Sequence, residues 1–236
     1  MENPNIDEAK RRAAAAAVKL VMPGMRLGLG TGSTAAQFIT LLGARVAEGL
    51  DVICVPTSER TRAQAAALGI PLTAFEDIDE LDLTIDGADE FDPELRLVKG
   101  GGGALWREKI VASASKQMVV ITDASKAVTT LGKFPLPIEV SRFGMEATRR
   151  AIAKAAEATG CAGAVVPRKT ASGEAFITDN GNYLVDCAFN AIGAPDDLAQ
   201  RLSAIPGIVE HGLFIGLATA VIMAGAEDLK NFGHLE

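Results

Sequence analysis

The chain has 236 residues, with 23 Lys or Arg against 30 Asp or Glu, so its formal net charge is −7. An acidic chain repels phosphate backbones and anionic lipids, which disfavours nucleic-acid and membrane-surface partners. Three separated cysteines and two histidines are too few for a disulfide framework or a Cys/His metal site. We therefore expect a cytoplasmic protein whose chemistry relies on carboxylates and lysines.

Helix and strand patterns alternate along the first half of the chain. An alanine-rich helix ends at Pro23-Gly24. The elements that follow are a strand at 25–29, a helix at 34–49, a strand at 51–55, a helix at 58–68, strands at 81–85 and 95–98, a helix at 104–116 and a strand at 117–122. This alternation is typical of an α/β fold, in which a mostly parallel sheet is flanked by helices.

The pattern changes to α+β after Lys126. A helix is predicted at 145–159, with short strands at 164–167, 175–178 and 183–188 and a hairpin turn at 179–182. Strand-like residues at 208–215 and 219–223 then favour a return to the first domain. We expect a Rossmann-like domain formed by residues 1–130 and 206–236, and a smaller α+β domain at 131–205.

The segment Gly28-Leu29-Gly30-Thr31-Gly32-Ser33-Thr34 links the first strand to the next helix. Glycines let a ligand approach the backbone closely, and the N–H groups at a helix N-terminus attract anions. Three hydroxyl side chains here suit a terminal monophosphate. Two alternatives remain open. One is a tight capped turn without a ligand, and the other is a dinucleotide site in which Glu59 holds the ribose.

A carboxylate cluster and a glycine run follow two further strands. Asp86 and Asp89 come directly after an apolar strand, at the end where open α/β sheets bind ligands. We interpret Glu90 and Asp92 as a solvated turn. Lys99 precedes four consecutive glycines, whose ordering costs conformational entropy. We expect their N–H groups and the ammonium to hold an oxyanion, with a flexible linker as the alternative.

Glu108 is a lone carboxylate on an apolar helix stripe. Its neighbours within about 60° around the helix include no basic residue, so no ion pair on its own helix explains it. Burial would raise its pKa and make it a competent general base. The alternative is a glutamate that points into solvent, as we expect for Arg107 and Lys109. Lys126 follows another strand and could reach the same crevice, whereas His211 is expected to be packed.

Taken together, these segments resemble the type A ribose-5-phosphate isomerases. The resemblance rests on Gly28–Thr34, Asp86–Glu90, Lys99–Gly103 with Arg107–Lys109, Asp123–Lys126 with Gly132–Pro137, and Thr178–Asn182, in family order. It implies interconversion of D-ribose 5-phosphate and D-ribulose 5-phosphate through an enediolate, in the non-oxidative branch of the pentose phosphate pathway, without metal or organic cofactor. It also implies a homodimer or homotetramer.

The resemblance makes Glu108 the catalytic base, and it assigns substrate binding to Thr31, Gly32, Ser33, Thr34, Asp86, Gly87, Ala88, Asp89, Lys99, Gly100, Gly101, Gly102 and Lys126. On chemical grounds we expect Lys99 to stabilise the enediolate, and Asp86, oriented by Asp89, to open the furanose ring. Lys10 is a weaker phosphate candidate. The alternatives are an amino-sugar-phosphate isomerase/deaminase, a CoA transferase with a glutamate nucleophile, and a non-catalytic sugar-phosphate sensor.

Overall fold

The computed structural model describes residues 4–235, which form two compact units. Unit 1 contains residues 4–88, 107–127 and 216–235, and unit 2 contains residues 89–106 and 128–215. The chain passes from one unit to the other after Ala88, Trp106, Ala127 and Ile215. Each unit is therefore assembled from separate stretches of the sequence.

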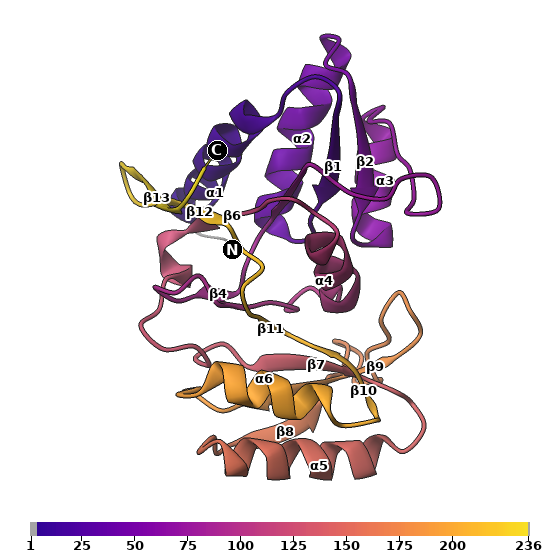
Figure 1. Cartoon of the computed structure of the whole chain (residues 1–236), viewed down its shortest axis with the longest axis vertical. Helices are drawn as coiled ribbons and strands as arrows, with labels where there is room; N and C mark the ends of the chain where they lie inside the picture. Colours follow the sequence, from indigo (N-terminus) through magenta and orange to yellow (C-terminus); the bar gives the residue numbers. More distant parts are fainter. Residues whose placement is uncertain (1–3, 236) are drawn as a thin grey trace. The chain divides into compact units, whose positions relative to one another are not determined.

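A six-stranded sheet with the order β13-β12-β6-β3-β1-β2 forms the centre of unit 1 (Figure 1). Its neighbouring strands are parallel except for β12 and β13, so the expected mostly parallel α/β sheet is confirmed. The strands are β1 (Met25–Leu29), β2 (Val52–Pro56), β3 (Leu83–Asp86), β6 (Met118–Asp123), β12 (Ala220–Ala224) and β13 (Leu229–Gly233). The helices are α1 (Pro4–Ala17), η1 (Val18–Leu20), α2 (Ser33–Ala47), α3 (Glu59–Ala67), η2 (Ala124–Lys126) and, from Arg107 onward, α4 (Leu105–Ser113).

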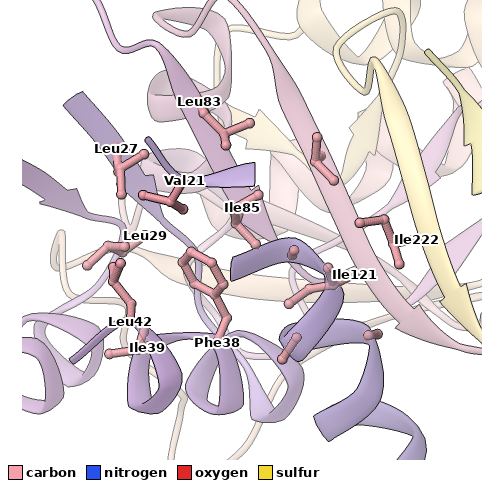
Figure 2. Close-up of a cluster of buried hydrophobic side chains, with 14 of the residues drawn as sticks. Val21, Leu27, Leu29, Phe38, Ile39, Leu42, Leu83, Ile85, Ile121 and Ile222 are labelled. Carbon is pink, nitrogen blue, oxygen red and sulfur yellow. The ribbon is translucent and has the colours of Figure 1, made fainter. Parts of the chain in front are cut away.

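One face of this sheet is buried by α1 and α2. Phe38, Ile39 and Leu42 form an apolar stripe along α2 and pack against strand residues that include Leu29 and Ile121 (Figure 2). Burial of each such side chain stabilises the fold by roughly 1.5–3 kcal/mol. This core holds the first strand and the following helix in a fixed relation, and so it positions the loop between them.

Helix α4 packs on the opposite face of the sheet. Gly28 of β1 points to this face, where a Cβ atom at Gly28 would overlap Oγ1 of Thr84 and lie 2.5 Å from Cγ1 of Val111. Ser115, just beyond α4, forms a hydrogen bond with Thr84, with 2.6 Å between the two hydroxyl oxygens. The missing side chain at Gly28 therefore lets α4 lie directly against β1 and β3.

A four-stranded antiparallel sheet with the order β10-β7-β9-β8 forms the centre of unit 2. Helices α5 and α6 cover one face, where Ile138 of β7 belongs to the same buried cluster as Ile152 of α5 and Leu198 of α6. A three-stranded sheet, β11-β5-β4, completes the unit. The elements are β4 (Glu90–Phe91), β5 (Leu97–Val98), β7 (Leu136–Val140), α5 (Met145–Ala158), β8 (Ala164–Pro167), β9 (Tyr183–Ala188), α6 (Pro195–Ser203), β10 (Ile208–His211) and β11 (Leu213–Phe214).

The predicted hairpin turn at 179–182 is held by a buried carboxylate. Glu139 of β7 is fully buried, and its Oε1 accepts hydrogen bonds from Thr178 Oγ1 and Asn182 Nδ2, each at 2.9 Å. The Thr178 N–H donates to the Asn182 carbonyl oxygen at 3.0 Å and closes the turn. Glu139 thus ties the turn to the sheet of unit 2.

Two sequence predictions need correction at the level of strands, and several elements were not predicted. Residues 208–215 stay in unit 2, because β10 pairs with β7 and β11 with β5, and it is β12 that joins the sheet of unit 1. Residues 175–178 make only isolated bridges. Strands β4, β7 and β13 and helix α6 were not predicted. In the part of the chain that the structure describes, no helix is long and apolar enough to cross a bilayer.

Candidate active site

The predicted substrate residues of unit 1 lie at one edge of its sheet. Strand β1 lies between β2 and β3. The chain leads from β1 to β2 on one side of it, and then from β2 to β3 on its other side, so the strand order reverses at β1. In open α/β sheets such a switch point forms a crevice at the carboxyl ends of the strands, where ligands bind. The loops after the adjacent strands β1, β3 and β6 carry Thr31–Thr34, Asp86–Ala88 and Lys126.

The first turn of α2 is suited to an anion. Gly32 caps the helix with a φ of 127° and contributes no side-chain hydrogen bond. The N–H groups of a first helical turn have no acceptor within the helix, and they carry partial positive charge. Ser33 is exposed and Thr34 is half-buried. Their hydroxyls and N–H groups can therefore receive the oxygens of a phosphate.

Thr31 differs from these two residues, because its hydroxyl points into the protein. Only 7% of Thr31 is exposed, and its Oγ1 lies 2.8 Å from Thr57 Oγ1, 2.8 Å from Ser58 Oγ and 3.0 Å from Thr61 Oγ1. The Thr31 hydroxyl donates to Ser58 Oγ, so its single hydrogen is already used inside the protein. The expectation that this hydroxyl donates to phosphate is wrong. The three partners were missed, although hydroxyl residues after a strand end were visible in the sequence.

Asp86 is the last residue of β3 and is fully buried. Its Oδ1 accepts hydrogen bonds from the Thr31 N–H at 3.1 Å and the Gly87 N–H at 2.7 Å. A Cβ atom at Gly30 would overlap this same carboxylate, so only glycine fits there. The loop after β1 and the carboxylate after β3 therefore form one rigid assembly.

Glu108 lies in the first turn of α4 and is 3% exposed. It is three and four residues before Val111 and Ala112, which are also buried, so all three share the inner face of the helix. The expected burial of Glu108 on the apolar stripe is confirmed, and the solvent-facing alternative is wrong. The helix itself is shorter than predicted, covering Leu105–Ser113.

The neighbouring Arg107 has an ion-pair partner on α3. Its Nη1 donates to Glu59 Oε1 at 2.7 Å, and Arg62 lies 3.4 Å from the other carboxylate oxygen. The hydrogen bond from Arg107 lowers the pKa of Glu59. Glu59 is thus engaged by two guanidinium groups, which argues against its assignment as the ribose-binding acid of a dinucleotide site.

Lys99 and the glycine run belong to unit 2. Lys99 is 2% exposed, and its Nζ lies 5.5 Å from the centre of the Phe214 ring, within range of a cation–π interaction. The backbone N–H of Lys99 donates to the Gly212 carbonyl oxygen at 2.9 Å. The ammonium is therefore held inside the protein rather than in bulk solvent, which strengthens its interaction with any anion that reaches it.

The four glycines form a defined turn rather than a flexible linker. Gly100 is buried with a φ of 107°, and its carbonyl oxygen accepts the Gly103 N–H at 3.0 Å. The Gly101 N–H donates to Asp89 Oδ2 at 2.7 Å. Gly101 and Gly102 are exposed. Asp89, which we expected to orient Asp86, therefore orients this glycine turn.

Glu90 and Asp92 are buried structural carboxylates, and their interpretation as a solvated turn is wrong. Glu90 is 3% exposed and accepts the Gly132 N–H at 2.7 Å. Asp92 is 1% exposed and binds the guanidinium of Arg96 at 2.7 Å. Both side chains fix loops of unit 2. A run of acidic residues looks the same in sequence whether its carboxylates are buried in this way or solvated in a turn.

The remaining candidates have simple environments. Lys126 is half-buried at the end of η2. Lys10 lies 3.5 Å from Asp7 on α1, and His211 is packed with its Nε2 3.1 Å from Ser203 Oγ. Among residues 4–235, no group of three or more His, Cys, Asp or Glu side chains is arranged to hold a metal ion.

Comparison with known proteins shows which family the sequence matches. The family model described as ribose 5-phosphate isomerase A (phosphoriboisomerase A) matches residues 53–228. The ribose-5-phosphate isomerase A of Bradyrhizobium diazoefficiens is 57% identical over 230 residues, which cover 96% of this chain and 95% of the relative. The corresponding protein of Nitrobacter hamburgensis is 58% identical over 225 residues, covering 95% and 97% of the two chains.

Solved structures agree with the sequence matches. The ribose 5-phosphate isomerase of Plasmodium falciparum superposes with a TM-score of 0.91 at 37% identity, covering 98% of this chain and 100% of the other. A D-ribose-5-phosphate isomerase in complex with phospho-erythronic acid gives a TM-score of 0.89 at 36% identity, covering 97% and 99%.

Proposed function

This chain belongs to the ribose 5-phosphate isomerase A family and interconverts D-ribose 5-phosphate and D-ribulose 5-phosphate, and we propose that Glu108 is its catalytic base. In the aldose-to-ketose direction, a proton leaves C2 of the open-chain aldose and is delivered to C1, while the hydroxyl proton moves from O2 to O1. The intermediate is an enediolate. A single carboxylate next to C1 and C2 can accept the proton from one carbon and return it to the other.

The observation that carries this assignment is the burial of Glu108 on the inner face of α4, at 3% exposure. A carboxylate held away from bulk water keeps the abstracted proton from exchanging before it is returned. A base positioned in this way contributes about 10²- to 10⁴-fold to the rate. The sensor alternative is not favoured, since a sensor needs no buried carboxylate of this kind.

Lys99 and the glycine turn are proposed to stabilise the enediolate oxygen. The support is chemical, because a buried ammonium and exposed backbone N–H groups are the donors that a transient oxyanion requires. Each well-placed donor of this type contributes about 3–4 kcal/mol to transition-state stabilisation. The Gly101 N–H is already bound by Asp89, so Gly102 is the proposed backbone donor.

Asp86 is proposed to open the furanose ring, and α2 to hold the phosphate. Ring opening removes the proton of the anomeric hydroxyl and delivers a proton to the ring oxygen, and Asp86, fixed in one orientation by two N–H groups, is proposed to take the first proton and pass it on. Ser33 and Thr34 supply hydroxyls and helix N-terminal N–H groups, and Lys126 adds a positive charge at the same sheet edge. The phosphate lies away from the reacting carbons, so its binding energy contributes to positioning.

Phospho-erythronic acid, which one structural relative binds, is proposed to bind this chain as well. Its carboxylate is planar and carries two oxygens, and so does the enediolate group formed by C1 and C2. Its phosphate matches that of the substrate. Compounds that resemble a transition state bind more tightly than substrates. We expect competitive inhibition with a Ki below the KM.

The direct test is Glu108→Gln, which keeps the size of the side chain and removes the basic oxygen. We expect kcat to fall by about 10²- to 10⁴-fold with a KM within about threefold of wild type. Transfer of deuterium from C2 of the aldose to C1 of the ketose should fall in parallel. The exposed residue Glu80 provides a matched control, Glu80→Gln, with wild-type kinetics. Wild-type kcat in Glu108→Gln would overturn the assignment.

We also propose that the protein is a cytoplasmic homodimer or homotetramer that binds neither nucleic acid nor membranes. The net charge of −7 and three buried, free cysteines support this proposal. Light scattering should give two or four times the chain mass of 24.5 kDa. The mass of a monomer would contradict it.

A further inference from the structure

Arg168, which follows β8 in unit 2, binds the glycine turn from the side of the carbonyl groups. Its Nη1 donates to the carbonyl oxygens of Gly100 at 3.0 Å and Gly101 at 3.1 Å. These residues are 68 and 67 positions away in the sequence. The contact therefore exists only because the fold of unit 2 brings the end of β8 to the turn.

Two neighbours hold the Arg168 guanidinium in place. Asp186 of β9 binds it in a two-point ion pair, with 2.8 Å between Nε and Oδ2, and the side chain of Arg168 is 14% exposed. The centre of the Phe176 ring lies 5.7 Å from the guanidinium carbon, and Phe176 also packs against Gly103. A two-point arginine–carboxylate pair has a fixed geometry that lysine cannot reproduce.

This contact determines where the N–H groups of the turn point. In a trans peptide the C=O and N–H bonds point in opposite directions. Because Arg168 binds the carbonyl oxygens of Gly100 and Gly101, the N–H groups of Gly101 and Gly102 must point away from the guanidinium. The Gly101 N–H accordingly reaches Asp89 Oδ2 at 2.7 Å. Gly102 is exposed, so its N–H can be reached by an oxygen atom from outside the protein.

From this geometry we propose that Arg168, held by Asp186, is a positioning residue that orients the enediolate-stabilising glycine turn. The proposal rests on the function assigned above to Lys99 and the turn. Arg168 acts by fixing two carbonyl groups, and through them the direction of the Gly102 N–H. Four glycines in succession would otherwise sample many backbone conformations, each with a different N–H direction.

The test compares Arg168→Ala and Arg168→Lys with Arg142→Ala. Arg142 is a matched control, because it also stacks on an aromatic ring, Tyr183 at 5.4 Å, and donates to a backbone carbonyl of unit 2, but it does not contact the glycine turn. We expect Arg168→Ala to lower kcat about tenfold to a hundredfold, since small misplacements of catalytic groups have effects of this size. KM should stay within about threefold. Arg168→Lys should be impaired to a smaller degree.

Chemical rescue separates positioning from general stability. Guanidinium ion at tens of millimolar should restore part of the kcat of Arg168→Ala, and it should have no such effect on wild type or Arg142→Ala. If Arg168→Ala does not fold, Arg168→Lys and Asp186→Asn carry the test, and each should show lower kcat at a wild-type melting temperature. Wild-type kcat in the folded Arg168 variants, or a change in KM alone, would overturn the proposal.

The outcome for Lys99→Met distinguishes this inference from the proposed function. If neither Lys99→Met nor the Arg168 variants lower kcat, the function proposed for Lys99 and the turn fails. If Lys99→Met loses activity while the Arg168 variants do not, the function stands and only the positioning role fails.

Discussion

The backbone N–H of Thr31 donates a hydrogen bond to Oδ1 of Asp86 at 3.1 Å, so that the loop after β1 and the end of β3 form a single assembly. Thr31 is itself fixed by three hydroxyl groups, and Gly30 leaves the space that the Asp86 carboxylate occupies. The residue proposed to open the sugar ring is therefore oriented by the same loop that leads into the proposed phosphate site. Phosphate binding and ring opening share one structural support.

Asp86→Asn should separate ring opening from isomerisation. The amide oxygen can still accept the Thr31 N–H, but the side chain can no longer exchange a proton with the ring oxygen. The variant then depends on open-chain aldose formed in solution. We expect the rate with ribose 5-phosphate to reach a plateau as enzyme concentration is raised, whereas the wild-type rate stays proportional to it. A rate proportional to enzyme at every concentration would contradict the ring-opening role of Asp86.

Ser33→Ala combined with Thr34→Ala should weaken substrate binding. Hydrogen bonds to a charged group contribute about 1.5–3 kcal/mol each. We therefore expect KM to rise at least about tenfold, with a smaller change in kcat, in steady-state kinetics. Thr40→Ala is the control on the same helix, because its hydroxyl donates to the Ala36 carbonyl oxygen and accepts from Gln64 Nε2, and it lies beyond the first turn. An unchanged KM in the double variant would place the phosphate elsewhere.

Asp82 should make the stability of the protein dependent on pH in the acid range. Hydrogen bonds from the Arg26 side chain and backbone, with a further one from Lys116, hold the pKa of Asp82 well below its usual value. A carboxyl whose pKa is lowered by folding stabilises the folded state at pH values above its unfolded pKa of about 4, and this contribution is lost as pH falls toward the folded pKa.

The measurement is the melting temperature of Asp82→Asn against wild type as a function of pH. The variant should melt at a lower temperature at pH 7, and the difference should shrink steadily below about pH 4. Asp197→Asn serves as the control, because its ion pair with Arg201 is exposed on a helix surface and contributes little. A difference that stays constant between pH 7 and pH 3 would contradict this account.

The sequence predicted what depends on local pattern. The mostly parallel sheet, the glycine loop before α2 and the burial of Glu108 follow from hydrophobic periodicity and from residues close together in the chain. The role of Arg168 could not be predicted, since its partners lie 67 and 68 residues away and a single arginine after a strand is unremarkable. Glu90 and Asp92 were misinterpreted for the same reason, because their partners are fixed only by the fold.

In the sheet of unit 1, strand β12 lies next to the edge strand β13, and both strands come near the end of the chain. Strand β12 pairs with β6, each residue with one that lies 101 positions earlier in the chain, and β12 also pairs with β13. During synthesis on the ribosome, β6 emerges long before β12 and its edge stays uncovered while unit 2 is translated. We therefore expect nascent chains that end before residue 220 to expose an open strand edge, which favours association between unfinished chains.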